Sequence, residues 1–146
     1  MADFFSSMEI SASGMTAERT RMNVASSNLA NATTTETPEG GPFKRLDVVL
    51  QSTPARGAIS GAAAGGTNPA VNGVKVGGIV QDSSAPRLEY DPGHPDANAD
   101  GYVAYPNVNV VEEMVDMITA SRAYEAGVTS LNTAVSMAER ALSIGK

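Results

Sequence analysis

The sequence predicts a mainly α-helical protein. Its long N- and C-terminal helices pair as an antiparallel, coiled-coil-like stalk, with a small central β-hairpin element and a flexible loop. Three observations lead to this prediction. Both ends of the chain carry apolar residues at alternating steps of three and four. The opposite faces of both expected helices are almost uncharged. A stretch rich in Gly and Ala, with few large apolar side chains, lies between the two ends.

The C-terminal helix is expected from Asn109 to Lys146. Asn109 and Glu112 resemble a capping box at its start, and Gly145 suits a C-terminal cap. At 1.5 Å per residue this helix is roughly 50 Å long, so it needs a second long element to cover it. Its single stripe of apolar or small residues comprises Val111, Met114, Ile118, Ser121, Tyr124, Val128, Leu131, Val135, Ala138 and Leu142.

The N-terminal residues 3–32 mirror this pattern and provide that second element. The helix weakens at the β-branched run 33–35 and ends before Pro38. Two long, matched helices at opposite ends of one chain most simply pair with each other. The N-terminal seam comprises Phe4, Met8, Ser11, Met15, Glu18, Met22, Ala25, Leu29 and Ala32.

The outer faces of both helices carry small neutral residues, where a helix facing water usually carries Lys and Glu. Such a face allows another backbone to approach closely, although an ordinary amphipathic helix with few charges remains an alternative. The outer-face residues that we expect to be buried between subunits are Thr16, Thr20, Ser27, Ser121, Gly127, Ser130 and Thr133. The full set of candidate subunit-packing residues is Met8, Met15, Thr20, Met22, Asn28, Leu29, Asn31, Ser121, Tyr124, Gly127, Val128, Ser130, Leu131 and Val135.

The pair Asn28 and Asn31 near the end of the first helix has two interpretations. Asn side chains offer both donors and an acceptor, so they suit a subunit contact. They equally suit an intrachain cap on the last helical turn.

The middle of the chain is expected to form a small β element. Strand candidates are Leu46–Leu50 and Val74–Val80, with Arg87–Tyr90 as the hairpin partner of Val74–Val80 and Gly101–Tyr105 as a third short strand. Residues 51–73 are predicted to be a flexible loop, since they cannot bury enough surface to offset the entropy of ordering. The chain therefore divides into an N-terminal helix (1–35), a central loop and β element (36–106) and a C-terminal helix (107–146).

Composition excludes several classes of protein. The net charge of −6 argues against a nucleic-acid partner, and the absence of Cys removes disulfides and thiolate metal sites. No apolar run is long enough for a membrane span. The first ten residues lack a basic region and an apolar core, so we expect no cleaved secretory signal peptide.

Residue chemistry predicts no active site, no metal site and no cofactor, so we expect no enzymatic activity. Asp96–Gly101 matches the first half of an EF-hand loop, but the twelfth position is Asn107, where a bidentate Glu is required. An Asx-rich turn is the favoured interpretation. His94 is the only histidine, and it lies in a turn between Gly93 and Pro95.

Three segments together resemble the bacterial flagellar basal-body rod proteins, and most closely the proximal-rod protein C family. They are SASGMTAERTRMNVASSNLANATTTETPEGGPFKR (11–45), DGYVAYPNVNVVEEMVDMITASRAYEAGVTSLNTA (100–134) and the terminal SMAERALSIGK. The Asn-Leu-Ala-Asn core, Asn28–Asn31, matches the signature shared by rod and hook proteins. The resemblance covers more than half of the chain, whereas 51–73 matches no pattern of the family.

This resemblance implies a structural protein whose paired helices stack in a helical tube, the drive shaft that crosses the periplasm. It implies as partners copies of the chain, other rod proteins and basal-body components, and the flagellar type III export apparatus. Two other classes stay open. A soluble two-helix adaptor would form a single defined dimer in sedimentation at high concentration. A calcium-binding module at 96–100 would bind calcium tightly in calorimetry.

Overall fold

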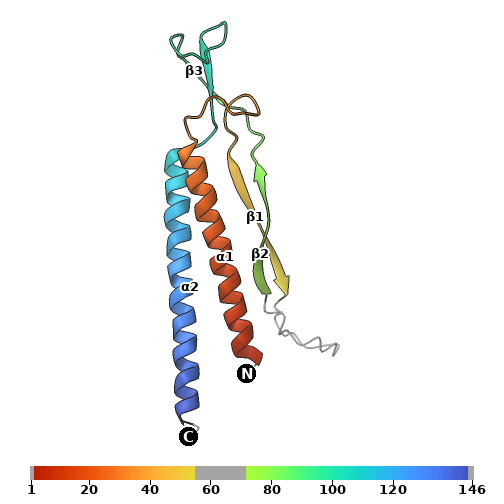
Figure 1. The fold of residues 1–146 in the computed structure, drawn as a ribbon, viewed down its shortest axis with the longest axis vertical. Coiled ribbons are helices and arrows are strands. Elements are labelled where there is room, and N and C mark those ends of the chain that lie inside the picture. Colours follow the sequence, from red (N-terminus) through yellow and green to blue (C-terminus); the bar gives the residue numbers. More distant parts are fainter. Residues whose placement is uncertain (1, 55–71, 145–146) are drawn as a thin grey trace.

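The computed structural model describes residues 2–54 and 72–144, which form two long helices, a long β-ribbon and a short β-hairpin (Figure 1). Both predicted helices and all four predicted strands are present, and β1 and β2 are longer than expected. The elements are α1 (Ala2–Ala30), β1 (Leu46–Pro54), β2 (Asn72–Gln81), β3 (Arg87–Tyr90), β4 (Tyr102–Tyr105) and α2 (Val110–Ile144).

The helices α1 and α2 lie side by side and run in opposite directions, as predicted (Figure 1). Asn109 caps α2, because its Oδ1 accepts a hydrogen bond from the Val111 N–H at 3.1 Å. Asn31 caps the other helix: its Nδ2 donates to the Ser27 carbonyl at 2.9 Å, and its Oδ1 accepts from the Thr34 hydroxyl. The expected cap Gly145 lies outside the described residues.

The predicted stripe of α2 is wrong in its first turns. Val111, Met114 and Ile118 are 68%, 44% and 52% exposed, whereas Glu113 and Ala120 are buried. The ten predicted positions average fewer than 3.6 residues per turn, so on a straight helix the stripe rotates around the axis. It coincides with the face toward α1 only in the middle of the helix, and Leu142 at its far end is again exposed.

The strand pairing also differs from the prediction. The partner of β2 is β1, in an antiparallel ribbon from Leu46↔Gln81 to Pro54↔Asn72, and β3 pairs with β4 instead. A β-bulge interrupts the ribbon: Val49 pairs with Gly78 and Leu50 with Val76, which leaves Gly77 as the extra residue. Of the predicted loop 51–73, both ends belong to this ribbon, and residues 55–71 lie outside the described part of the chain.

The ribbon lies along α1 on the side away from α2 (Figure 1). Near the tip of the ribbon, the Val74 N–H donates to Ser13 Oγ at 3.1 Å. Because the two strands form no wider sheet, they gain much of their stability from this helix.

The β3–β4 hairpin stands beyond the end of the stalk where α1 ends and α2 begins (Figure 1). Its long loop turns back at Gly101, where φ is +80° and an added Cβ would lie 2.9 Å from the Tyr90 ring. The rings of Tyr90 and Tyr102 pack edge to face at 5.3 Å. Thr35 ties the loop to the connection after α1 by donating to Asp96 at 2.6 Å.

The buried core is small and consists mainly of small side chains. A helix pair with a two-stranded ribbon along one side is too narrow to enclose large ones. Among the described residues, the buried apolar positions are Ala17, Val24, Ala25, Ala32, Val103, Val108 and Ala120.

Candidate functional site

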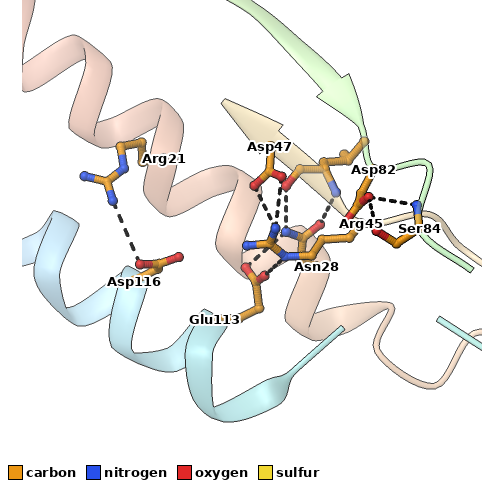
Figure 2. A network of polar contacts seen from close by, with 9 residues as sticks. Arg21, Asn28, Arg45, Asp47, Asp82, Ser84, Glu113 and Asp116 are labelled. Atoms are coloured by element: carbon orange, nitrogen blue, oxygen red, sulfur yellow. Dashed lines mark hydrogen bonds and ion pairs between the residues drawn. The ribbon is translucent and has the colours of Figure 1, made fainter. Parts of the chain in front are cut away.

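The most elaborate polar arrangement lies where the end of α1, the start of β1 and the first turn of α2 meet (Figure 2). We call it the junction, and define it by Asn28, Arg45, Leu46, Asp47 and Glu113. Asn28 is 1% exposed and bonds to the backbone of Leu46 in both directions, at 2.9 Å each. Its amide thus acts as a short β-strand partner for the first residue of β1.

Glu113 completes the junction from α2. Its Oε2 accepts from Asn28 Nδ2 at 3.0 Å, and its Oε1 accepts from Arg45 Nε at 2.6 Å. The side chain is only 2% exposed, so its charge is taken out of water and is compensated by these two donors. One carboxylate therefore ties α2 both to α1 and to the chain entering β1.

The Arg45 side chain is held from two directions. Its NH1 lies 2.9 Å from the Asp47 carboxylate, while Nε contacts Glu113. The hydrogen bond to Glu113 raises the pKa of Arg45 above its usual value, although burial acts in the opposite direction. Arg45 therefore stays charged, as the buried carboxylate requires.

The end of the ribbon is fixed beside this cluster. The Asp82 N–H donates to the Arg45 carbonyl at 2.7 Å. The Asp82 carboxylate accepts from both the hydroxyl and the N–H of Ser84, and these bonds lower the pKa of Asp82. Arg21 of α1 and Asp116 of α2 lie farther out, with a weak contact of 3.9 Å between them (Figure 2).

This chemistry is structural. The junction residues line a cavity of about 170 Å³, but no buried side-chain polar atom of the described residues lacks a hydrogen-bond partner. The Glu113 carboxylate and the Asn28 amide therefore already bond within the chain. The arrangement fixes the position of the ribbon relative to the helix pair.

The Asx-rich loop before β4 is a turn, which is the interpretation that the sequence favoured. Asn98 Oδ1 accepts from the N–H groups of Asp100 and Tyr102, at 3.0 and 2.9 Å. Strands flank this loop, whereas an EF-hand needs helices. Within residues 2–54 and 72–144, no group of three or more acidic or His side chains is placed to hold a metal ion. No described helix is both long and apolar enough to cross a membrane.

Most of the sequence-predicted packing residues are already half-buried within one chain. Asn28 is fully buried in the junction, and Ser130 is exposed. The half-buried residues are Met8, Met15, Thr20, Met22, Leu29, Asn31, Ser121, Tyr124, Gly127, Val128, Leu131 and Val135. Asn28 and Asn31 both make intrachain bonds, and only Asn31 acts as a cap.

Gly127 lies on a different face from the one we expected. A Cβ built on it would lie 2.7 Å from Met15 Cγ, so it faces α1 of the same chain and not outward. The absence of a side chain there lets α1 and α2 approach each other. The close backbone approach that the sequence suggested is therefore explained within the monomer at this position.

The sequence analysis singled out neither Arg45 nor Glu113. A signal for Glu113 exists: counting back from Tyr124 at helical spacing passes through Ala120 and Met117 and reaches Glu113, which places it on the inner face. Arg45 lies 68 residues away in the chain, and no local pattern connects the two.

Two family models match the chain, one at each end. The model described as "Flagella basal body rod protein" matches residues 8–36, and that described as "Flagellar basal body rod FlgEFG protein C-terminal" matches 99–144. These ranges include the paired helices and two of the three segments that meet at the junction, the end of α1 and the start of α2. Fold and matches together define the class: a structural subunit of the flagellar basal-body rod, and not an enzyme.

Comparison with curated proteins identifies one family within this class of rod subunits. The flagellar basal-body rod protein FlgC of Bacillus subtilis is 47% identical over 97% of this chain and 98% of its own length. The FlgC proteins of Borreliella burgdorferi and Escherichia coli O6:H1 are 44% and 43% identical, over 96% and 94% of this chain and 96% and 95% of theirs. The chain belongs to the FlgC family.

Proposed function

We propose that the chain polymerises with copies of itself and with other rod proteins through its terminal helices, as part of a tube crossing the periplasm. In this proposal, segments 1–35 and 107–146 form a coiled-coil-like stalk that makes the main subunit contacts, and 36–106 forms the middle element. The observation that supports polymerisation is the large surface that the chain exposes. The chain exposes 10186 Å², whereas a compact monomer of its mass exposes about 7,000 Å².

Much of this surface is apolar. On the outer side of α2, Val111, Val115 and Ile118 are more than half exposed, and on the ribbon Ile79 is 51% exposed. An exposed apolar stripe such as that of Val111, Val115 and Ile118 on α2 is typical of a protein–protein contact site. None of the described residues of the chain covers these side chains.

The polar residues of the outer faces are also suited to burial. The hydroxyls of Thr16, Thr20, Thr129 and Thr133 each donate to the carbonyl four residues earlier in their own helix, at 2.9–3.0 Å. Because these donors are already satisfied, a neighbouring subunit can cover them without leaving a buried polar group unpaired.

We infer further that the chain reaches the rod through the flagellar type III export apparatus and is not cleaved. Its membership of a rod family supports this route. An intact-mass measurement of the chain recovered from basal bodies tests it: the mass of the uncleaved sequence is expected, and a shortened N-terminus contradicts it.

Comparing Leu131→Asp with Leu131→Met tests polymerisation. Leu131 is half-buried on the helix pair, so a carboxylate there is costly whereas Met keeps the volume. We expect Leu131→Met in purified basal bodies at the wild-type level and Leu131→Asp to be absent from them. A wild-type chain that sediments at high concentration as one defined dimer, and is missing from basal bodies, supports the two-helix adaptor instead.

A further inference from the structure

His94 lies in the loop between β3 and β4, beside the bond that joins this loop to the rest of the chain. The hairpin stands beyond the end of the stalk (Figure 1). Thr35, in the connection after α1, donates from its hydroxyl to Asp96 Oδ2 at 2.6 Å. We call this hydrogen bond the tie. Because it joins the loop to the connection directly, it helps to set the orientation of the loop against the stalk.

The neutral His94 ring holds Asp96 in the position that the tie requires. Its Nδ1 accepts a hydrogen bond from the Asp96 backbone N–H at 3.1 Å, in the way that an Asn side chain does in an Asx turn. An imidazole nitrogen accepts only when it is unprotonated, so this bond requires a neutral ring with its proton on Nε2. The same Nδ1 lies 3.7 Å from Asp96 Oδ2, the oxygen that accepts from Thr35.

The other groups around His94 offer a charged ring no better partner. On β4, the Tyr105 ring packs edge to face with the imidazole at 6.3 Å, and Arg87 of β3 already lies over that tyrosine ring at 5.8 Å. Earlier in the loop, the Asp91 carbonyl accepts from the His94 N–H, and its carboxylate accepts from the loop backbone. Among the described residues, Asp96 is the only acid in ion-pair contact with His94.

We propose that protonation of His94 transfers the Asp96 carboxylate from Thr35 to the imidazolium and so releases the β3–β4 loop from the stalk. A protonated Nδ1 is a donor, so the Asp96 N–H loses its acceptor while the carboxylate gains an ion pair. Closing the 3.7 Å gap to hydrogen-bonding distance draws Oδ2 away from Thr35. Because imidazole is the side chain that changes charge in this range, the tie holds at about pH 8 and opens at about pH 5. The exchange takes place within one chain and needs no polymerisation.

Hydrogen exchange at the Asp96 amide follows its bond to His94. In the purified chain, the protection factor, corrected for the intrinsic pH dependence of exchange, is expected to fall about fivefold from the higher to the lower pH, the equivalent of one neutral hydrogen bond. His94→Asn keeps a side-chain acceptor for this N–H at every pH, so its protection should not change. An equal pH response of wild type and His94→Asn overturns the inference.

Spin labels follow the tie itself. The chain has no Cys, so Glu39→Cys in the connection and Asp100→Cys in the loop place two unique thiols at exposed positions. The distribution of distances between the labels is expected to be narrow at the higher pH and broad at the lower one. Adding Thr35→Val should make it broad at both. Adding Asp96→Asn, which keeps an acceptor for Thr35 but removes the charge, should keep it narrow at both. A distribution that does not respond to pH while Thr35 and Asp96 are both present contradicts the release of the loop.

Discussion

The two ends of the stalk are held by different kinds of interaction. At the junction, buried Asn28 and Glu113 and the charged Arg45 fix three segments through bonds of 2.6–3.0 Å. At the other end, α2 extends past α1, and Met137 and Leu142 are exposed. The contrast shows that one end fixes the geometry of three segments, whereas the other leaves apolar side chains that no described residue of the chain covers.

Of the changes considered, removal of the Glu113 carboxylate at the junction is expected to lower the free energy of unfolding most. Glu113→Ala leaves Arg45 and the Asn28 amide without their buried acceptor, so the free energy of unfolding falls by about 3 kcal/mol. Glu112→Ala, at an exposed neighbouring position, is the control and changes it by less than about 0.5 kcal/mol. Urea unfolding measures both. Equal effects of the two variants contradict the assignment of the junction as the fixed end.

Asn28→Ala tests the amide that binds the ribbon. The change leaves the N–H and carbonyl of Leu46 without their partner, at a cost of about 2 kcal/mol, while Asn23→Ala on the exposed side of α1 is nearly neutral. Hydrogen exchange at the Leu46 amide sharpens the test, because faster exchange is expected in the Asn28 variant only. Unchanged protection there means that the ribbon is positioned by other contacts.

Substitutions at two glycines compare the inner and outer faces of the helices. An added Cβ at Gly14 meets nothing within 4 Å, so Gly14→Ala is expected to stabilise the protein by about 1 kcal/mol through helix propensity. At Gly127 the overlap with Met15 offsets that gain, and Gly127→Leu destabilises by about 1–2 kcal/mol. Thermal unfolding measures the variants. Rescue of Gly127→Leu by Met15→Ala is expected, and its absence contradicts this contact.

The smallest effect on the free energy of unfolding is expected for Asp82→Asn, at the edge of the junction. The Ser84 bonds lower the pKa of Asp82 in the folded protein, so their stabilisation is present above the usual carboxyl range and is lost as the pH falls through the lowered pKa. Asp82→Asn should therefore be slightly less stable than wild type at neutral pH and equal to it in strong acid. Urea midpoints across that range check the sign; a gap that widens toward low pH is the contrary result.

The helices and their pairing were predictable because helical spacing and capping residues are local signals. Asn109 caps α2 as predicted, and Met15 faces α2 as its seam implied. The outer turns of the α2 stripe were misassigned because a near-heptad count accumulates an angular error along a straight helix. The error placed Val111 on the buried stripe, whereas in the structure Val111 is exposed and Glu113 is buried.

The strand pairing and the junction were not predictable in the same way. Val74–Val80 has two plausible partners, and alternation alone does not choose between Leu46–Leu50 and Arg87–Tyr90. The contact of Arg45 with Glu113 joins residues 68 positions apart and depends on how three elements converge. Likewise, the resemblance identified the segment Asn28–Asn31, yet its two asparagines have separate tasks that only the fold reveals.

The ribbon is fastened to α1 at two separate heights, at Ser13 through Val74 and at Asn28 through Leu46. These points are 15 residues apart on the helix, roughly 22 Å along its axis. Bending or twisting α1 between them forces the ribbon to slide against it, and the hydrogen bonds at both fastenings resist that shear. The ribbon therefore braces α1 along this stretch, so that bending or twisting the helix there has to strain both attachments.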